Sequence, residues 1–86
     1  MKRSNLADKS EIVVKRWFDA LDTLIEKGRI GSFAKFTRDY HISRPALSRL
    51  RAEPQRKFEP YYFQILVESY GVSAHWLITG KGGMGI

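Results

Sequence analysis

Residues 32–50 read SFAKFTRDYHISRPALSRL, and this stretch predicts two short helices joined by a tight turn. Ser32 is suited to cap a helix over 33–40, because its side-chain oxygen can accept a hydrogen bond from a free N–H in the first turn. Ser43 stands in the same relation to a second helix over 43–52. Only a short break, His-Ile-Ser, is expected between the two helices.

The second of these helices is expected to have an apolar rear face and a cationic front face. Leu47 and Leu50 are the inward positions, and the outward positions are Arg44, Ser48, Arg49 and Arg51. Pro45 falls in the first turn, where its missing N–H removes no hydrogen bond. The break needs a residue that tolerates left-handed backbone, and His41 stands there. This combination is typical of the helix-turn-helix motif.

A longer helix is expected before this stretch, over residues 10–27. Apolar residues recur at spacings of three and four and so share one stripe, namely Val13, Trp17, Leu21, Leu24 and Ile25. Asp8 or Ser10 is expected to cap the start of this helix, and Gly28 to end it. The acidic residues Asp19, Asp22 and Glu26 are expected to form a solvated face, salt-bridged with Lys15 and Arg16.

Two more helices are expected after the pair. Pro60 opens one whose inward residues are Tyr62, Phe63, Leu66, Val67 and Tyr70, and Gly71 ends it. Ser73 caps a brief last helix that Gly80 closes. No stretch alternates between apolar and polar residues as a strand does. The sequence therefore predicts an all-α, compact five-helix domain over 10–80, with a flexible arm over 1–9 and a flexible tail over 81–86.

The positive charge is concentrated in one third of the chain. The 86 residues contain 15 Lys and Arg against 9 Asp and Glu, a net charge of +6. Residues 29–57 contain eight of the basic residues and only two acidic ones, so this segment accounts for the whole excess. Such segregation indicates a polyanionic partner that meets one face of the protein.

Composition and spacing argue against several other classes of protein. The chain has no cysteine, which excludes disulfides, thiol catalysis and cysteine-ligated metals. His41 and His75 lack metal-ligand spacing, and no nucleophile lies near a base, so we expect no metal, no cofactor, no small-molecule site and no enzymatic activity. No apolar run suits a signal peptide or a membrane span, and a cytoplasmic location is the expectation. Trp17, Phe18, Phe36 and Tyr62 are expected in the core rather than stacked on bases.

The stretch 32–50 resembles the helix-turn-helix of the lambda-repressor/Cro-like (XRE-type) family, especially across Ile-Ser-Arg at 42–44 and Leu-Ser-Arg-Leu at 47–50. Residues 76–82, WLITGKG, resemble the W-L-x-T-G-x-G ending frequent in such bacterial and phage proteins. The resemblance covers about residues 10–83. The sequence departs from the family pattern at three positions. His41 stands where the family usually has glycine, and Phe33 where it often has glutamine. Pro45 stands at a position of the second helix where the family rarely has proline.

The resemblance implies a set of DNA-contacting residues. Base contacts in the major groove are implied for Arg44, Pro45, Ser48 and Arg49. Phosphate contacts are implied or proposed for Ser32, Phe33, Lys35, Ser43, Arg51, Arg56 and Lys57. His75, Trp76 and Leu77 either close the core over the first helix or, together with Ile78, belong to a dimer interface.

We therefore expect a sequence-specific regulator of transcription, a repressor of bacterial or phage type, that binds double-stranded DNA as a homodimer on an inverted repeat. RNA polymerase is the protein partner that this role implies. The alternative is an antitoxin-like module that binds a toxin protein and has accessory DNA binding. RNA is a weaker candidate, because a helix does not fit the deep, narrow major groove of A-form RNA.

Overall fold

The computed structural model describes residues 3–86, with side chains described from Ser10 onward. The helices are α1 (Arg3–Glu26), α2 (Phe33–Asp39), α3 (Arg44–Ala52), α4 (Pro60–Gln64), η1 (Ile65–Ser69), which continues α4, and α5 (Ala74–Thr79). The described part of the chain contains no β-strand, and the predicted all-α class is confirmed. None of these helices is both long and apolar enough to cross a membrane.

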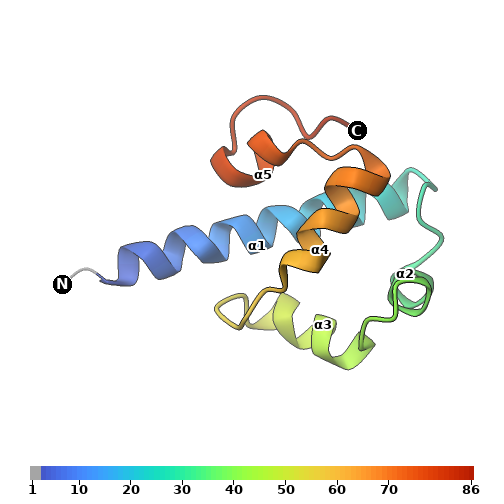
Figure 1. The fold of residues 1–86 in the computed structure, drawn as a ribbon, viewed down its shortest axis with the longest axis horizontal. Coiled ribbons are helices and arrows are strands. Elements are labelled where there is room, and N and C mark those ends of the chain that lie inside the picture. Colours follow the sequence, from blue (N-terminus) through green and yellow to red (C-terminus); the bar gives the residue numbers. More distant parts are fainter. Residues whose placement is uncertain (1–2) are drawn as a thin grey trace.

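Helix α1 is longer than the sequence predicted. It begins at Arg3 rather than near residue 10, so the expected caps Asp8 and Ser10 lie within it and the predicted start was wrong. Residues 3–9 contain neither proline nor glycine, and nothing in them interrupts the helix. Residues 3–9 of the predicted arm thus belong to α1, which extends well beyond the other helices at its N-terminal end (Figure 1).

The buried stripe of α1 is centred one residue away from the expected one. Val14, Trp17, Phe18, Ala20, Leu21 and Leu24 are buried, whereas Val13 and Ile25 are only partly covered. Trp17 lies at the centre, where its ring packs edge-on against Phe18, Phe36 and Phe58. Its indole N–H donates to the carbonyl of Tyr62 at 2.9 Å, which satisfies the polar atom of this fully buried side chain. The predicted core position is confirmed for Trp17, Phe18 and Phe36, which are buried, and Tyr62 packs against the core while only partly buried.

The same backbone motif ends both α1 and α2. After α1, the N–H of Gly28 donates to the carbonyl of Ile25 and that of Arg29 to Leu24. After α2, the N–H of His41 donates to Arg38 at 3.3 Å and that of Ile42 to Thr37 at 2.8 Å. This is the Schellman pattern, which needs a left-handed residue at its centre.

The left-handed residue differs between the two helix ends. Gly28 has φ of 78°, and His41 has φ of 57°. His41 is the one described residue other than glycine with positive φ, so the left-handed backbone expected at this position is confirmed. A side chain in this conformation is less favourable than glycine, and the turn therefore holds some strain.

Both serine caps of the central pair are present. The Ser32 side chain accepts a hydrogen bond from the N–H of Lys35 at 3.0 Å, and the Ser43 side chain accepts from Ala46 at 3.2 Å. In Figure 1, α2 is seen nearly end-on while α3 lies across the view, so the two helices cross steeply. Leu47 and Leu50 are buried as predicted and fix the rear of α3 to the core.

The fourth helix begins at Pro60 as predicted but changes its pitch. It widens into a π-helix at η1, and Gly71 ends it in left-handed conformation. A π-turn adds a residue to the turn and shifts the register of the faces. Leu66 is buried as predicted, and Ile65, which was not predicted to face inward, is buried beside it. The remaining residues predicted to face inward are only partly buried, namely Tyr62, Phe63, Val67 and Tyr70.

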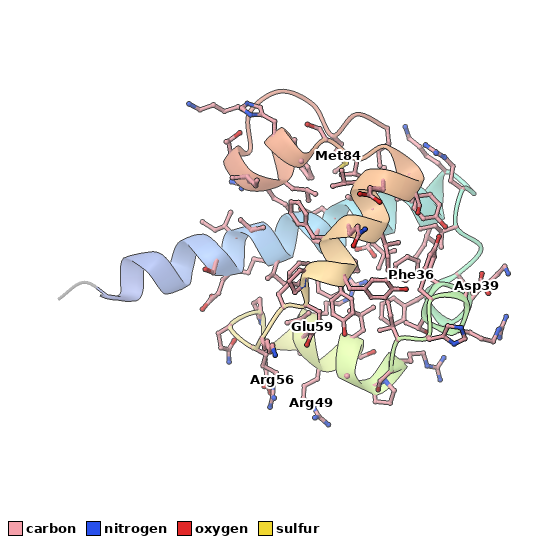
Figure 2. All side chains as sticks on the ribbon, in the orientation of Figure 1. Phe36, Asp39, Arg49, Arg56, Glu59 and Met84 are labelled. Atoms are coloured by element: carbon pink, nitrogen blue, oxygen red, sulfur yellow. The ribbon has the colours of Figure 1, made fainter. Side chains whose placement is uncertain are left out.

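Helix α5 is attached to α1 by a basic side chain. Arg16 donates from Nη1 to the carbonyls of Leu77 and Ile78, at 3.0 and 3.1 Å, and so satisfies the C-terminal end of α5. Ser73 caps its start, as predicted, by accepting from the N–H of Trp76. The chain then folds back, and the Met84 carbonyl accepts from the N–H of Ser73 at 2.7 Å, which holds the last residues against η1 and α5 (Figures 1 and 2). The flexibility of 81–86 stays a prediction.

Candidate nucleic-acid interface

Helix α3 presents the four residues predicted to contact bases. All four are exposed, namely Arg44, Pro45, Ser48 and Arg49. They form two neighbouring pairs that are each four residues apart, 44 with 48 and 45 with 49, so they lie on one side of the helix. The opposite side carries Leu47, which is fully buried, and Leu50. Figure 2 shows Arg49 pointing away from the body of the protein. The helix is therefore anchored from behind and polar in front.

The two arginines of this face differ from the other basic residues around it in their surroundings. Among residues 10–86, neither Arg44 nor Arg49 forms an ion pair or a side-chain hydrogen bond. Each guanidinium keeps its five N–H donors for another molecule. Two of the four predicted base contacts are thus cations whose charge no carboxylate within residues 10–86 neutralises.

The four cations predicted to contact phosphates have different surroundings, because each lies beside a carboxylate. The pairs are Lys35–Asp39 at 3.0 Å, Arg51–Asp22 at 2.9 Å, Arg56–Glu53, and Lys57–Glu59 at 3.8 Å. Three of these pairs are local in sequence, and the pair of Arg51 joins α3 to α1. The charge available to a phosphate at these positions is smaller than a count of basic residues indicates.

The pair between Arg51 and Asp22 is the most completely formed of the four. Both carboxylate oxygens accept from the guanidinium, at 2.9 and 3.0 Å, in the two-pronged geometry that suits these groups. The guanidinium also lies 4.7 Å from the ring centre of Phe18 and 5.6 Å from that of Phe33. The hydrogen bonds to Asp22 raise the pKa of Arg51.

This arrangement corrects the expectation for the acidic face of α1. Asp22 does not pair with Lys15 or Arg16 in the described part of the chain, because it reaches across to α3 instead. Arg16 is directed to the carbonyls at the end of α5. Helical spacing identified neighbours on α1, but partners on other helices are nearer in space.

The start of α2 lies next to the same contact. Ser32 is exposed, and its hydroxyl, whose oxygen accepts from Lys35, keeps a hydrogen to donate. Phe33 is partly buried and its ring contacts Arg51, so only its backbone N–H can serve a phosphate. Ser43 is likewise exposed at the start of α3. The predicted phosphate contacts at the two helix starts are thus accessible groups rather than buried ones.

Arg38 and Ile12 are exposed residues that were not among the predicted contacts. Arg38 on α2 is exposed and has no ion pair among residues 10–86, and its membership of the basic segment was the available signal. Ile12 on α1 is 43% exposed, and its position outside the apolar stripe could have identified it. A cation and an apolar side chain thus add to the accessible surface.

The two expectations for α5 apply to different residues. Leu77 is fully buried and closes the core over α1. Ile78 is 59% exposed, His75 is exposed, and Trp76 is half-buried. The candidates for an interface therefore reduce to the outer residues of α5.

The chain was compared with family models, curated proteins and solved structures. No family model, curated protein or solved structure matches it. Any functional interpretation therefore depends on the residues and geometry described above.

Proposed function

We propose that this protein is a sequence-specific, double-stranded DNA-binding regulator of transcription with an XRE-type helix-turn-helix, in which α3 enters the major groove. The observation that supports it best is that Arg44 and Arg49, which have no ion pair among residues 10–86, lie on the exposed side of a helix whose other side is buried. The tight turn at left-handed His41 and the steep crossing of α2 and α3 also support the proposal, because a helix-turn-helix joins two steeply crossing helices by a short turn.

The proposed chemistry of base recognition follows from the side chains of α3. An arginine can donate two parallel hydrogen bonds to O6 and N7 of guanine, which discriminates against other bases by about 1–3 kcal/mol. Ser48 can donate or accept, and Pro45 offers an apolar contact such as a thymine methyl. Arg44 and Arg49 are therefore the residues to which we assign most of the sequence preference.

Orientation on the duplex would come from the backbone contacts around α3. In this proposal Ser32 and Ser43, whose side chains cap α2 and α3, would contact phosphates on either side of the groove. Such contacts carry no sequence information but fix the register of the reading helix.

We further propose that the protein binds as a homodimer on an inverted repeat, with the α3 helices in major grooves about 34 Å apart. Ile78, on the outer side of α5, is the exposed apolar residue that supports an interface there. A dimer bound over a promoter would repress by occluding RNA polymerase.

The direct test selects bound sequences from random duplex DNA and then measures affinity for the selected site. Arg44→Ala and Arg49→Ala should each bind that site at least fivefold more weakly than the wild type. Lys27→Ala, which removes the same charge from an exposed position at the end of α1, is the matched control and should change affinity less than twofold. Failure to select any sequence, or equal losses in all three variants, would refute sequence-specific recognition by α3.

A further inference from the structure

Two arginines on α3 differ in a way that their positions in the sequence do not suggest. Arg49 and Arg51 are both exposed and both lie in the second half of the helix. Arg49 has no partner among residues 10–86, whereas both terminal nitrogens of the Arg51 guanidinium donate to Asp22 of α1. Asp22 thus acts on a cation of the very helix that we propose enters the groove.

The guanidinium of Arg51 is constrained by more than its ion pair. It lies within cation–π distance of Phe18, which is on α1, and of Phe33, the first residue of α2. Aromatic contacts and a two-pronged hydrogen bond together fix both the position and the plane of the group. Arg51 therefore cannot turn toward a phosphate without giving up contacts with two other helices.

The position of α3 itself does not depend on this ion pair. Leu47 and Leu50 are buried behind the helix, and Ser43 caps its start. The side chains of Arg51 and Asp22 are 42% and 52% exposed, and ion pairs at that exposure contribute little to stability. The pair therefore acts on the charge that α3 presents rather than on the position of the helix.

A carboxylate beside a cation changes what that cation offers to DNA. The affinity for any duplex depends on the number of phosphates that protein cations neutralise, each of which adds about 0.9 to the slope of log K against log salt. A cation that is already neutralised by a carboxylate neutralises no phosphate, so no counterion is released from the DNA at that position. The carboxylate also repels the phosphate. Arg51 contributes little to this term as long as Asp22 holds it.

We propose that Asp22 is a specificity-determining residue of the DNA-binding surface, because it withholds Arg51 from DNA phosphates and so lowers the affinity for DNA of any sequence. This inference rests on the proposed function. On random DNA no base contact fixes the orientation of the protein, so a released Arg51 can find a phosphate. On the selected site, Arg44 and Arg49 set the orientation, and the released side chain gains less.

The test uses Asp22→Asn, which keeps the size of the side chain and removes its charge. Affinity for random duplex DNA at 100 mM salt should rise about three- to tenfold, and the salt slope should steepen by about 0.9, the value for one added phosphate contact. Affinity for the selected site should change less than twofold. Glu26→Gln, on the same helix and without an ion pair among residues 10–86, is the matched control. It should leave the affinities for random DNA and for the selected site within twofold of the wild type and the salt slope within about 0.3.

The double variant Asp22→Asn/Arg51→Met distinguishes release of Arg51 from simple loss of a negative charge. With Arg51 absent, affinity for random DNA and the salt slope should return to the wild-type values, and thermal unfolding checks that each variant is folded. The inference is overturned if Asp22→Asn binds random DNA as the wild type does, or if the double variant keeps the gain. A wild-type protein that binds no DNA would instead refute the proposed function itself.

Discussion

The outer face of α3 and the surface around it carry cations in two different states. Arg44 and Arg49 on the face have no partner among residues 10–86, while Lys35, Arg51, Arg56 and Lys57 around it each lie beside a carboxylate. Figure 2 shows Arg49 and Arg56 pointing to the same side of the molecule, so the difference is in pairing rather than direction. The comparison teaches that charge count alone does not define a nucleic-acid surface, since most of these charges are internally compensated.

The largest effect should come from the unpaired side of the comparison. Combining Arg44→Ala with Arg49→Ala removes the two proposed arginine–base contacts, each of which is expected to contribute about 1–3 kcal/mol of discrimination. We expect the double variant to bind its selected site and random DNA with affinities that differ by less than threefold. Competition between labelled site and unlabelled random duplex measures this ratio directly. A double variant that keeps the wild-type ratio would show that α3 does not read bases.

The turn between α2 and α3 should affect the stability of the protein rather than its affinity for DNA. Replacing His41 with glycine removes the penalty of a side chain in left-handed backbone, and the free energy of unfolding should rise by about 1 kcal/mol. DNA affinity should stay within twofold, because the turn keeps its shape. Urea denaturation measures the stability. The opposite replacement at the end of α1, Gly28→Ala, should lower stability, since the new side chain would adopt φ near 78°.

The caps and the turn of the central pair follow from the sequence because they depend on neighbours in the chain. The side chains of Ser32 and Ser43 each accept a hydrogen bond from the backbone N–H three residues later in the chain. Pro45 lies in the first turn of α3, the part of a helix that tolerates proline. Left-handed backbone at His41 follows from the short distance between two helices. Interactions of this range are encoded locally, and local patterns are what a single sequence displays.

The partners of Arg51 and Arg16 do not follow from the sequence, because they lie far away along the chain. Arg51 and Asp22 are 29 residues apart, and Arg16 binds carbonyls 61 and 62 residues away. These contacts depend on how α1 packs against α3 and α5, which helical spacing does not specify. The π-turn at η1, where Ile65 and Leu66 are buried, was not predicted either.

An intermediate effect, on the free energy of unfolding, is expected for Arg51, one of the cations that lie beside a carboxylate. Arg51→Met removes the ion pair to Asp22 and two cation–π contacts, which together contribute about 1 kcal/mol at this exposure. Thermal unfolding should show the loss, while the salt slope for random DNA should change by less than 0.3. A slope that falls by about 0.9 would indicate that Arg51 neutralises a phosphate in the wild-type protein.

The smallest effect is expected in the loop that follows α3. Arg56→Ala and Lys57→Ala each remove a cation that already has a carboxylate beside it, Glu53 and Glu59 respectively. We expect less than a twofold loss of affinity for the selected site from either change at 100 mM salt. Fluorescence anisotropy with labelled duplex is sufficient to measure it. Losses as large as those of the α3 variants would remove the distinction between paired and unpaired cations.

The central claim is that the unpaired arginines of α3 read bases, and Arg49→Lys tests it most directly. Lysine keeps the positive charge but cannot make the two parallel hydrogen bonds of a guanidinium. Affinity should be measured for the selected site and for sites in which each base pair is changed in turn. We predict that Arg49→Lys loses discrimination at one base pair while its affinity for random DNA stays within twofold of the wild type. Wild-type discrimination at every position would contradict the account.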